Sequence, residues 1–174
     1  MYIETDRLIL KPFEERDKSL AINMFVNDQI KQTYMLPDFP SEEAAAKLFY
    51  RLQELSLTEG RFVVGVYRKT EDGPVLIGFM NDVEIKDGKI EMGYVIDPTY
   101  HNQGYCTEAL KGMIQYLLEH GFSRVITGAF EGNAASLRVM EKSGMQKIDY
   151  TDEITYRGKV HRCIYYVMDK EQNK

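Results

Sequence analysis

The stretch from Ile96 to Leu110 reads IDPTYHNQGYCTEAL and predicts the end of a strand, a short polar loop and the start of a helix. The first N–H groups of a helix have no acceptor within it and lie at the positive end of the helix dipole. Gly104 carries no Cβ, so the backbone there can approach an anion closely. The junction therefore suits a pyrophosphate. An ordinary structural turn would give the same pattern, and neither the Walker A nor the dinucleotide fingerprint is matched.

Before this junction, the spacing of apolar residues predicts four strands and two helices. Asp17 and Ser41 are the expected N-caps of the two helices. The first helix is expected to bury Leu20, Ala21, Met24 and Phe25. The second shows an apolar stripe of Ala45, Leu48, Phe49, Leu52 and Leu55. The strands are expected at residues 7–11, 61–67, 75–83 and 90–96, with a hairpin signal at 86–89.

After the junction, a helix is expected at 105–120 with Gly121 as its C-cap, then a strand at 124–130 and a helix at 134–142. Two final strands are expected near 145–150 and 160–168. The strand–helix–strand order from residue 90 to residue 130 predicts one parallel strand pair in an otherwise antiparallel sheet. The sequence thus predicts a mixed α/β sheet in a single domain, residues 1–174.

Composition narrows the class of protein. The chain has 174 residues, of which 44% are hydrophobic and 28% charged, as in ordinary globular proteins. No apolar run approaches the roughly 20 residues that cross a bilayer, and no signal peptide is recognisable, so a cytoplasmic protein is expected. A formal net charge of −5 argues against a nucleic-acid surface. The cysteines Cys106 and Cys163 lie far apart, which supports neither a metal site nor a disulfide framework.

Two further segments accompany the glycine loop: residues 90–96 read IEMGYVI, and residues 133–145 read NAASLRVMEKSGM. The first, with the loop and Glu108-Ala109-Leu110, resembles the acetyl-CoA motif of the GNAT superfamily, Gln/Arg-x-x-Gly-x-Gly/Ala. The second resembles that family's Asn-x-x-Ser helix ending in Lys-x-Gly-Phe. The opening ETDRLIL at residues 4–10 looks like the start of the ribosomal-protein-alanine N-acetyltransferase subgroup. The resemblance covers nearly the whole chain.

The loop departs from the family pattern at several positions. His101 replaces the usual Gln or Arg, Asn102 a frequent Gly, and Cys106 the usual Gly or Ala, while Met145 replaces the customary Phe. A neutral histidine attracts phosphate less than arginine does, so a lower affinity for the cofactor is expected. Gly104 and the helix start remain.

The resemblance implies an α/β (α+β) GNAT-like fold, with a mixed, mostly antiparallel sheet flanked by helices and a central parallel strand pair splayed around acetyl-CoA. Acetyl-CoA would be a co-substrate, and no metal is implied. The pantetheine arm would run along a strand and contact Met92, Tyr94, Val95, Ile96 and the side chain of Asn133. The pyrophosphate would lie against His101, Asn102, Gln103, Gly104, Tyr105, Cys106 and Thr107. Asn133 has the alternative role of a simple helix cap.

Two residues are candidates for catalysis. Glu91 is our hypothesis for the base that deprotonates the amine, and Ser136 matches the family serine that protonates the departing thiolate. A solvent-facing carboxylate and a helix-terminus hydroxyl are the corresponding structural readings. Cys106 is interpreted as a packing residue, because no histidine-based activation pattern accompanies it.

The acceptor is left open by the sequence. The subgroup resemblance points to the α-amine of a protein N-terminus, whereas a small amine such as an amino acid, polyamine or antibiotic is the alternative. A non-catalytic acyl-CoA sensor would carry the same loop. The resemblance is also compatible with a homodimer, and neither nucleic acid nor membrane is an expected partner.

Overall fold

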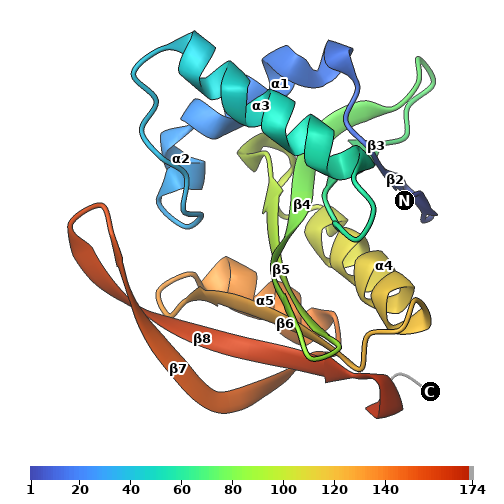
Figure 1. Ribbon diagram of the computed structural model, residues 1–174, viewed down its shortest axis with the longest axis vertical. Helices are drawn as coiled ribbons and strands as arrows, with labels where there is room; N and C mark the ends of the chain where they lie inside the picture. Colours follow the sequence, from blue (N-terminus) through green and yellow to red (C-terminus); the bar gives the residue numbers. More distant parts are fainter. Residues whose placement is uncertain (173–174) are drawn as a thin grey trace. The chain divides into compact units, whose positions relative to one another are not determined.

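Eight strands form one mixed sheet in the computed structural model, which describes residues 1–172 (Figure 1). Their order across the sheet is β1-β2-β3-β4-β5-β6-β8-β7. Among the pairs whose register the structure gives, β5 with β6 is parallel and the others are antiparallel. The predicted mixed, mostly antiparallel α/β sheet with one parallel strand pair is therefore confirmed.

The chain divides into two compact units, and each is described by itself. The first unit comprises residues 1–81 and 94–109, and the second comprises residues 82–93 and those from 110 onward. Three elements have residues in both units, namely β4 (Val75–Lys86), β5 (Lys89–Ile96) and α4 (Tyr105–Glu119).

The first unit contains the strands β1 (Ile3–Glu4), β2 (Leu8–Lys11) and β3 (Val64–Arg68). Its helices are α1 (Lys18–Val26), α2 (Asp28–Lys31) and α3 (Glu42–Leu57), with short 3-10 turns η1 (Glu15–Asp17) and η2 (Pro98–Tyr100). Helix α3 begins where the sequence predicts, since the Ser41 hydroxyl accepts a hydrogen bond from the Ala44 amide at 3.2 Å. Helix α2 was not predicted: four residues are too few to show a helical period.

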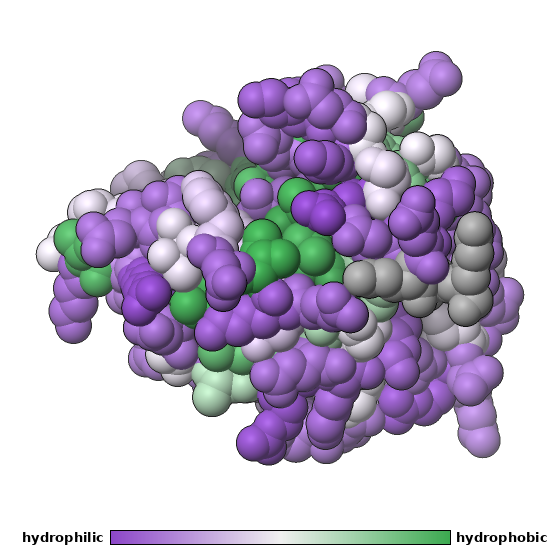
Figure 2. Space-filling model, turned by 90° about the horizontal axis from the view of Figure 1, so that it is seen from below, coloured by the Kyte–Doolittle hydropathy of each residue, from purple (hydrophilic) through white to green (hydrophobic). Residues whose placement is uncertain are grey.

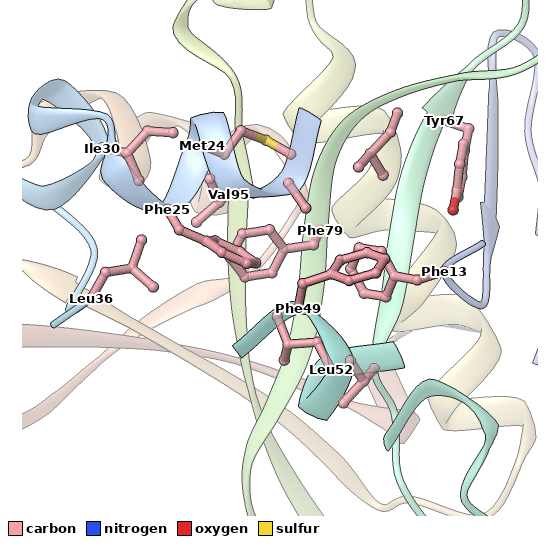
Figure 3. Packing of buried hydrophobic residues seen from close by; sticks show 13 residues of the cluster. Phe13, Met24, Phe25, Ile30, Leu36, Phe49, Leu52, Tyr67, Phe79 and Val95 are labelled. Atoms are coloured by element: carbon pink, nitrogen blue, oxygen red, sulfur yellow. The ribbon is translucent and has the colours of Figure 1, made fainter. Parts of the chain in front are cut away.

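An aromatic-rich core holds α1 and α3 against β3 and β4 (Figure 3). Phe25 packs edge-on against Phe79 at 5.8 Å between ring centroids, and Phe13 packs likewise against Phe49 at 6.0 Å. Burial of each large side chain contributes about 1.5–3 kcal/mol. This core fixes β4, and the Gly78 backbone of β4 lies so close to Val95 that a Cβ on Gly78 would stand 2.2 Å from the Val95 carbonyl oxygen.

Two predictions for the first helix are wrong. Leu20 is 43% exposed, and Ile22 is buried instead. The Asp17 side chain does not cap α1, although Asp17 stands at the N-cap position. It is buried and accepts hydrogen bonds from the Glu14 amide at 2.7 Å and the Tyr67 hydroxyl at 2.5 Å. A partner 50 residues away thus outweighs the local preference for capping.

The second unit contains β6 (Arg124–Phe130), α5 (Ala134–Lys142), β7 (Gln146–Tyr156), β8 (Lys159–Asp169) and the turn η3 (Lys170–Gln172). The predicted bounds of β6 and α5 are confirmed, whereas β7 runs six residues beyond its predicted end. Strand β8 lies between β6 and β7. Figure 2, seen from the side of β7 and β8, shows mostly hydrophilic residues around a smaller exposed apolar patch. Most β7 side chains are exposed.

A tight turn joins β4 to β5 within the second unit. Asp87 and Gly88 both have positive φ, 52° and 71°. Two such residues form the type I′ turn that suits the twist of a hairpin, as the sequence predicted. Strand β5 then pairs with β6 through Lys89 with Arg124, Ile90 with Val125, and Glu91 with Ile126.

Candidate active site

The glycine loop lies in the first unit, between η2 and α4. Asp97 begins it by accepting hydrogen bonds from the amide and the hydroxyl of Thr99, at 2.8 and 2.6 Å. Asn102 and Gly104 both have positive φ, 60° and 81°. Asparagine tolerates this region better than most residues, so Asn102 replaces a glycine at little cost. The departure from the family pattern at position 102 thus leaves the loop conformation available.

The first amides of α4 are candidate donors to an anion. The first hydrogen bond of α4 joins the Glu108 amide to the Gly104 carbonyl at 3.0 Å. Helix geometry leaves the earlier N–H groups without an intrahelical acceptor. Within residues 1–172, the structure gives no hydrogen bond from the amides of Gly104, Tyr105, Cys106 or Thr107. Four donors therefore lie at the positive end of a 15-residue helix.

His101 and Cys106 contribute differently from the backbone. The His101 ring is 2.8 Å from the Ile96 carbonyl oxygen through Nε2, so the ring is held back toward the end of β5. Burial raises the pKa of the Cys106 thiol to about 12. A thiol that keeps its proton at neutral pH is a poor nucleophile, which agrees with the packing role predicted for Cys106.

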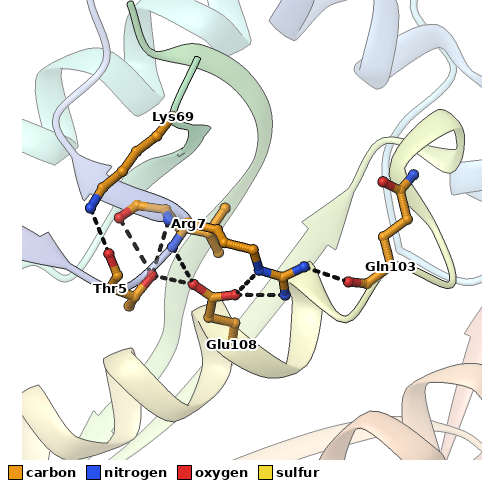
Figure 4. Close-up of polar contacts among 6 residues, drawn as sticks. Thr5, Arg7, Lys69, Gln103 and Glu108 are labelled. Carbon is orange, nitrogen blue, oxygen red and sulfur yellow. Dashed lines mark hydrogen bonds and ion pairs between the residues drawn. The ribbon is translucent and has the colours of Figure 1, made fainter. Parts of the chain in front are cut away.

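Arg7 and Glu108 form an ion pair next to the glycine loop (Figure 4). The sequence did not predict this pair. The Glu108 carboxylate accepts hydrogen bonds from the Thr5 hydroxyl at 2.6 Å, the Arg7 amide at 2.8 Å and the Arg7 Nε at 2.7 Å. The Arg7 Nη1 donates to the Gln103 carbonyl at 2.9 Å. Both residues stand in segments that carry the family resemblance, but 101 residues separate them, and only the fold brings them together.

Glu91 lies in the second unit, on β5 beside Ile126 of β6. Burial raises the pKa of Glu91, and the nearby charge of Glu84 raises it further. A pocket of about 260 Å³ is lined by Glu84, Lys86, Asp87, Lys89, Glu91 and Ile126. A half-buried carboxylate with a raised pKa in a pocket has the properties of a general base. Sequence reasoning did not identify Glu84.

Aromatic side chains of β6 and β8 pack together in the same unit. The Tyr165 ring lies across Gly128, its register partner, because a Cβ on Gly128 would stand 2.7 Å from a ring carbon of Tyr165. Burial raises the pKa of Tyr165 to about 12, and the charge of Glu91 adds to the effect. Phe130 stacks on His161 at 4.3 Å between centroids. Tyr165 and Glu91 are therefore close enough to interact electrostatically.

Asn133 and Ser136 stand at the start of α5, also in the second unit. The Asn133 side chain accepts a hydrogen bond from the Ser136 amide at 3.2 Å and so caps the helix. Ser136 is partly buried. The capping role of Asn133 is thus present, and it leaves the side-chain amide group of Asn133 with its own donors.

The predicted site residues fall into two groups. Glu91, Met92, Asn133 and Ser136 belong to the second unit. The others belong to the first, and they are Tyr94, Val95, Ile96, His101, Asn102, Gln103, Gly104, Tyr105, Cys106 and Thr107. Across the described chain, no three His, Cys, Asp or Glu side chains come together in a way that would hold a metal ion. None of the helices in residues 1–172 has the length and apolarity that a bilayer crossing requires.

Known proteins resemble this chain in sequence. The model of the acetyltransferase (GNAT) domain matches residues 7–146. The Bacillus subtilis (strain 168) protein YoaA, described as an uncharacterized N-acetyltransferase, is 30% identical over 90% of this chain and 89% of its own length.

Two solved structures have the same fold at lower identity. A GNAT-family acetyltransferase from Bacillus anthracis is 24% identical, with a TM-score of 0.83 over 98% of this chain and 99% of the other. RimL, a ribosomal L7/L12 α-N-protein acetyltransferase solved with coenzyme A, is 16% identical, with a TM-score of 0.81 over 99% of each chain. These likenesses confirm the GNAT-like fold. The chain belongs to the GNAT family and is an N-acetyltransferase.

Proposed function

We propose that this N-acetyltransferase moves the acetyl group of acetyl-CoA directly onto a primary amine, and that the acceptor is the α-amine of a protein N-terminus. The observation that carries the proposal is the raised pKa of Glu91 in its pocket. The family and the fold indicate the class of reaction, and individual residues are assigned to its steps.

The glycine loop binds the diphosphate of acetyl-CoA in this proposal. Among the residues that the structure describes, none accepts a hydrogen bond from the amides of Gly104, Tyr105, Cys106 and Thr107, and the helix dipole favours an anion there. His101, Asn102 and Gln103 form the remainder of the loop. The pantetheine arm is assigned to Met92, Tyr94, Val95, Ile96 and Asn133. No metal takes part in the proposed reaction.

Glu91 removes a proton from the attacking amine, directly or through a water molecule. An α-amino group has a pKa near 7.7–8.0, whereas a lysine side chain is near 10.4. Deprotonation at pH 7 therefore costs about 1 kcal/mol for the α-amine and roughly 4–5 kcal/mol for lysine. A carboxylate whose pKa is raised by burial is a stronger base than an ordinary carboxylate and suits the first task. This comparison favours a protein N-terminus over a lysine side chain.

The amine nitrogen attacks the thioester carbonyl carbon, and the carbon–sulfur bond of the resulting tetrahedral adduct then breaks. A backbone N–H near Met92 or Tyr94 is proposed to stabilise the developing oxyanion. Ser136 is proposed to give its proton to the leaving thiolate of CoA, and the proton that the acylated nitrogen then loses restores the Ser136 hydroxyl through solvent. Burial raises the pKa values of both cysteine thiols, Cys106 and Cys163. Neither thiol is thus activated as a nucleophile, which supports direct transfer over a covalent enzyme intermediate.

A small amine is the second candidate acceptor, and the pocket at Glu91 favours it. Its volume of about 260 Å³ is close to the lower limit of small-molecule sites. Three carboxylates and two lysines line the pocket, so both the amine and the carboxylate of an amino acid or a similar antibiotic would meet complementary charge. We propose the cytoplasm as the compartment, because the two free cysteines accord with reducing conditions.

A thiol-release assay tests the proposal. Acetyl-CoA is supplied with peptides of varied N-termini and, separately, with a panel of small amines including carboxylate-bearing ones. Release of free CoA that depends on a peptide α-amine, and its loss in Glu91→Gln, supports the primary proposal. Turnover with small amines alone transfers the assignment to the second candidate. Binding of acetyl-CoA without turnover on any acceptor contradicts the enzyme and indicates an acyl-CoA sensor.

A further inference from the structure

The Arg7–Glu108 pair extends the proposed function, because it lies directly against the glycine loop. We propose that Arg7, held by Glu108, is a positioning residue that aims the Gly104 N–H at the diphosphate of acetyl-CoA. The inference rests on the proposed function, since it assumes that the loop binds this diphosphate. It assigns the orientation of a loop amide to two residues outside the loop.

The first step is the bond from Arg7 to the loop. Arg7 Nη1 donates to the Gln103 carbonyl at 2.9 Å. The peptide bond between Gln103 and Gly104 is trans, as no cis peptide occurs in the described chain. In a trans peptide the C=O and the next N–H point in opposite directions. Holding the Gln103 carbonyl on Arg7 therefore directs the Gly104 N–H away from the guanidinium, toward the open side of the loop.

The second step is the rigidity of Arg7 itself. Its Nε and Nη2 both lie 2.7 Å from Glu108 Oε2. The guanidinium carbon lies 4.5 Å from the centre of the Tyr105 ring, so a cation–π contact holds the other side. Although the Arg7 side chain is 47% exposed, its planar head is fixed by a carboxylate, a carbonyl and a ring. A lysine in its place could not make this fork.

Glu108 is in turn held by contacts that do not involve the guanidinium. The Thr5 hydroxyl and the Arg7 amide donate to Oε1 at 2.6 and 2.8 Å. Burial would raise the pKa of Glu108, but these hydrogen bonds and the charge of Arg7 outweigh it and lower the pKa. The carboxylate therefore stays ionised, and it partly neutralises Arg7. That neutralisation argues for Arg7 as a positioning residue more than as a direct phosphate ligand.

Arg7 also occupies the space beside Gly104. A Cβ on Gly104 would stand 3.3 Å from Arg7 Nη2. The guanidinium thus occupies the side of Gly104 where other residues carry a side chain, and the loop can close on an anion only from the opposite side. His101 is held by the Ile96 carbonyl. The loop's geometry is consequently set by Arg7 more than by the residue that replaces the family's usual Gln or Arg.

The test compares two thioester donors in Arg7→Lys and Glu108→Gln. S-acetylpantetheine reacts at the same carbonyl but has no phosphate. For both variants, kcat/KM with acetyl-CoA should fall about tenfold through KM, with kcat at saturation nearly unchanged, and kcat/KM with S-acetylpantetheine should stay at the wild-type value. The affinity for CoA by calorimetry should fall by the same factor. The double variant should be little worse than either single one, because the two residues act together.

A matched pair of controls comes from the second unit. Arg124 and Asp169 form another two-contact ion pair, at 2.6 and 2.9 Å, outside the loop. Arg124→Lys and Asp169→Asn should leave kcat/KM unchanged with both acetyl-CoA and S-acetylpantetheine. Equal losses with acetyl-CoA and S-acetylpantetheine in the Arg7 and Glu108 variants would overturn the inference, as would unchanged CoA affinity. A wild-type protein that binds no CoA would instead sink the proposed function.

Discussion

Glu84 lies close enough to Glu91 for its charge to raise the pKa of Glu91, in addition to the larger effect of burial. The two carboxylates stand on the neighbouring strands β4 and β5 and line the same pocket. Burial and the charge of Glu84 together make Glu91 a stronger base than an ordinary carboxylate.

Removal of the Glu84 charge should move the acidic limb of the pH–rate profile. In Glu84→Gln, Glu91 loses its proton more easily, so its pKa falls and activity persists to lower pH. The shift should be partial, because burial is the larger cause. We would measure kcat/KM from pH 5 to pH 9 with one acceptor, so that ionisation of the amine is common to all variants. Asp87→Asn is the matched control: it removes one charge from the same pocket, and asparagine accepts the positive φ of Asp87. A profile that Glu84→Gln leaves in place would contradict this coupling.

Loss of the proposed base should lower turnover strongly. Glu91→Gln keeps the size of the side chain and removes its basicity, so kcat should fall by roughly 10²–10⁴-fold, with the acidic limb abolished. The affinity for CoA, measured by calorimetry, should be unaffected. Wild-type rates in this variant would end the assignment of Glu91.

The same substitution should stabilise the protein at neutral pH. The pKa of Glu91 is higher in the folded than in the unfolded state, so ionisation of Glu91 opposes folding. This penalty is complete above the folded pKa, is relieved as the pH falls through that value, and is absent below the unfolded pKa of about 4.3. The melting temperature of Glu91→Gln should exceed that of wild type by a few degrees at pH 7 and match it near pH 4. A difference that grows toward acid would contradict the sign of the shift.

Substitution of Gly104 should weaken acetyl-CoA binding. Its φ of 81° strains any L-residue, and the new Cβ would press on Arg7. Gly104→Ala should cost about 1–2 kcal/mol of stability and at least tenfold in CoA affinity. Gly104→Asp should lower the affinity further, because its carboxylate would lie on the Arg7 side of the loop and compete with the Gln103 carbonyl for the guanidinium. Gly60→Ala separates strain from function, because Gly60 has a similar φ of 76° and open space around it. It should lose stability without losing CoA affinity, as calorimetry and thermal melts would show.

Ser136→Ala tests the proposed acid. The Ser136 amide keeps its hydrogen bond to Asn133 in the variant, so the helix cap is preserved. The maximal rate should fall about tenfold or more, with little change in KM for acetyl-CoA. A raised KM with an unchanged rate would identify the hydroxyl as a binding or structural group.

The sequence predicted most accurately those elements that carry their own signals. Residues 124–130 and 134–142 have clear periods and end signals, and both were placed at their observed bounds. Ser41 and Asn133 cap their helices as their types and positions suggest. The conformation of Gly104 follows from its place between strand and helix.

Long-range partners explain what was missed. Asp17 binds Tyr67, 50 residues away, and Arg7 binds Glu108, 101 residues away. Contacts between residues so far apart in the sequence cannot be read from the pattern of residues within one segment. Glu84 was overlooked for a related reason, since its effect on Glu91 depends on the register of two strands and not on either strand alone.

The stacking of Tyr165 on Gly128 restricts how this protein family can vary. A larger residue at position 128 would displace the ring, so such a change should be found in related sequences only together with a smaller residue at position 165. The ring lies within electrostatic reach of Glu91. Paired replacement at these two positions would therefore reshape the surroundings of Glu91, the proposed base, and relatives that differ there are the ones in which to look for altered acceptor preference.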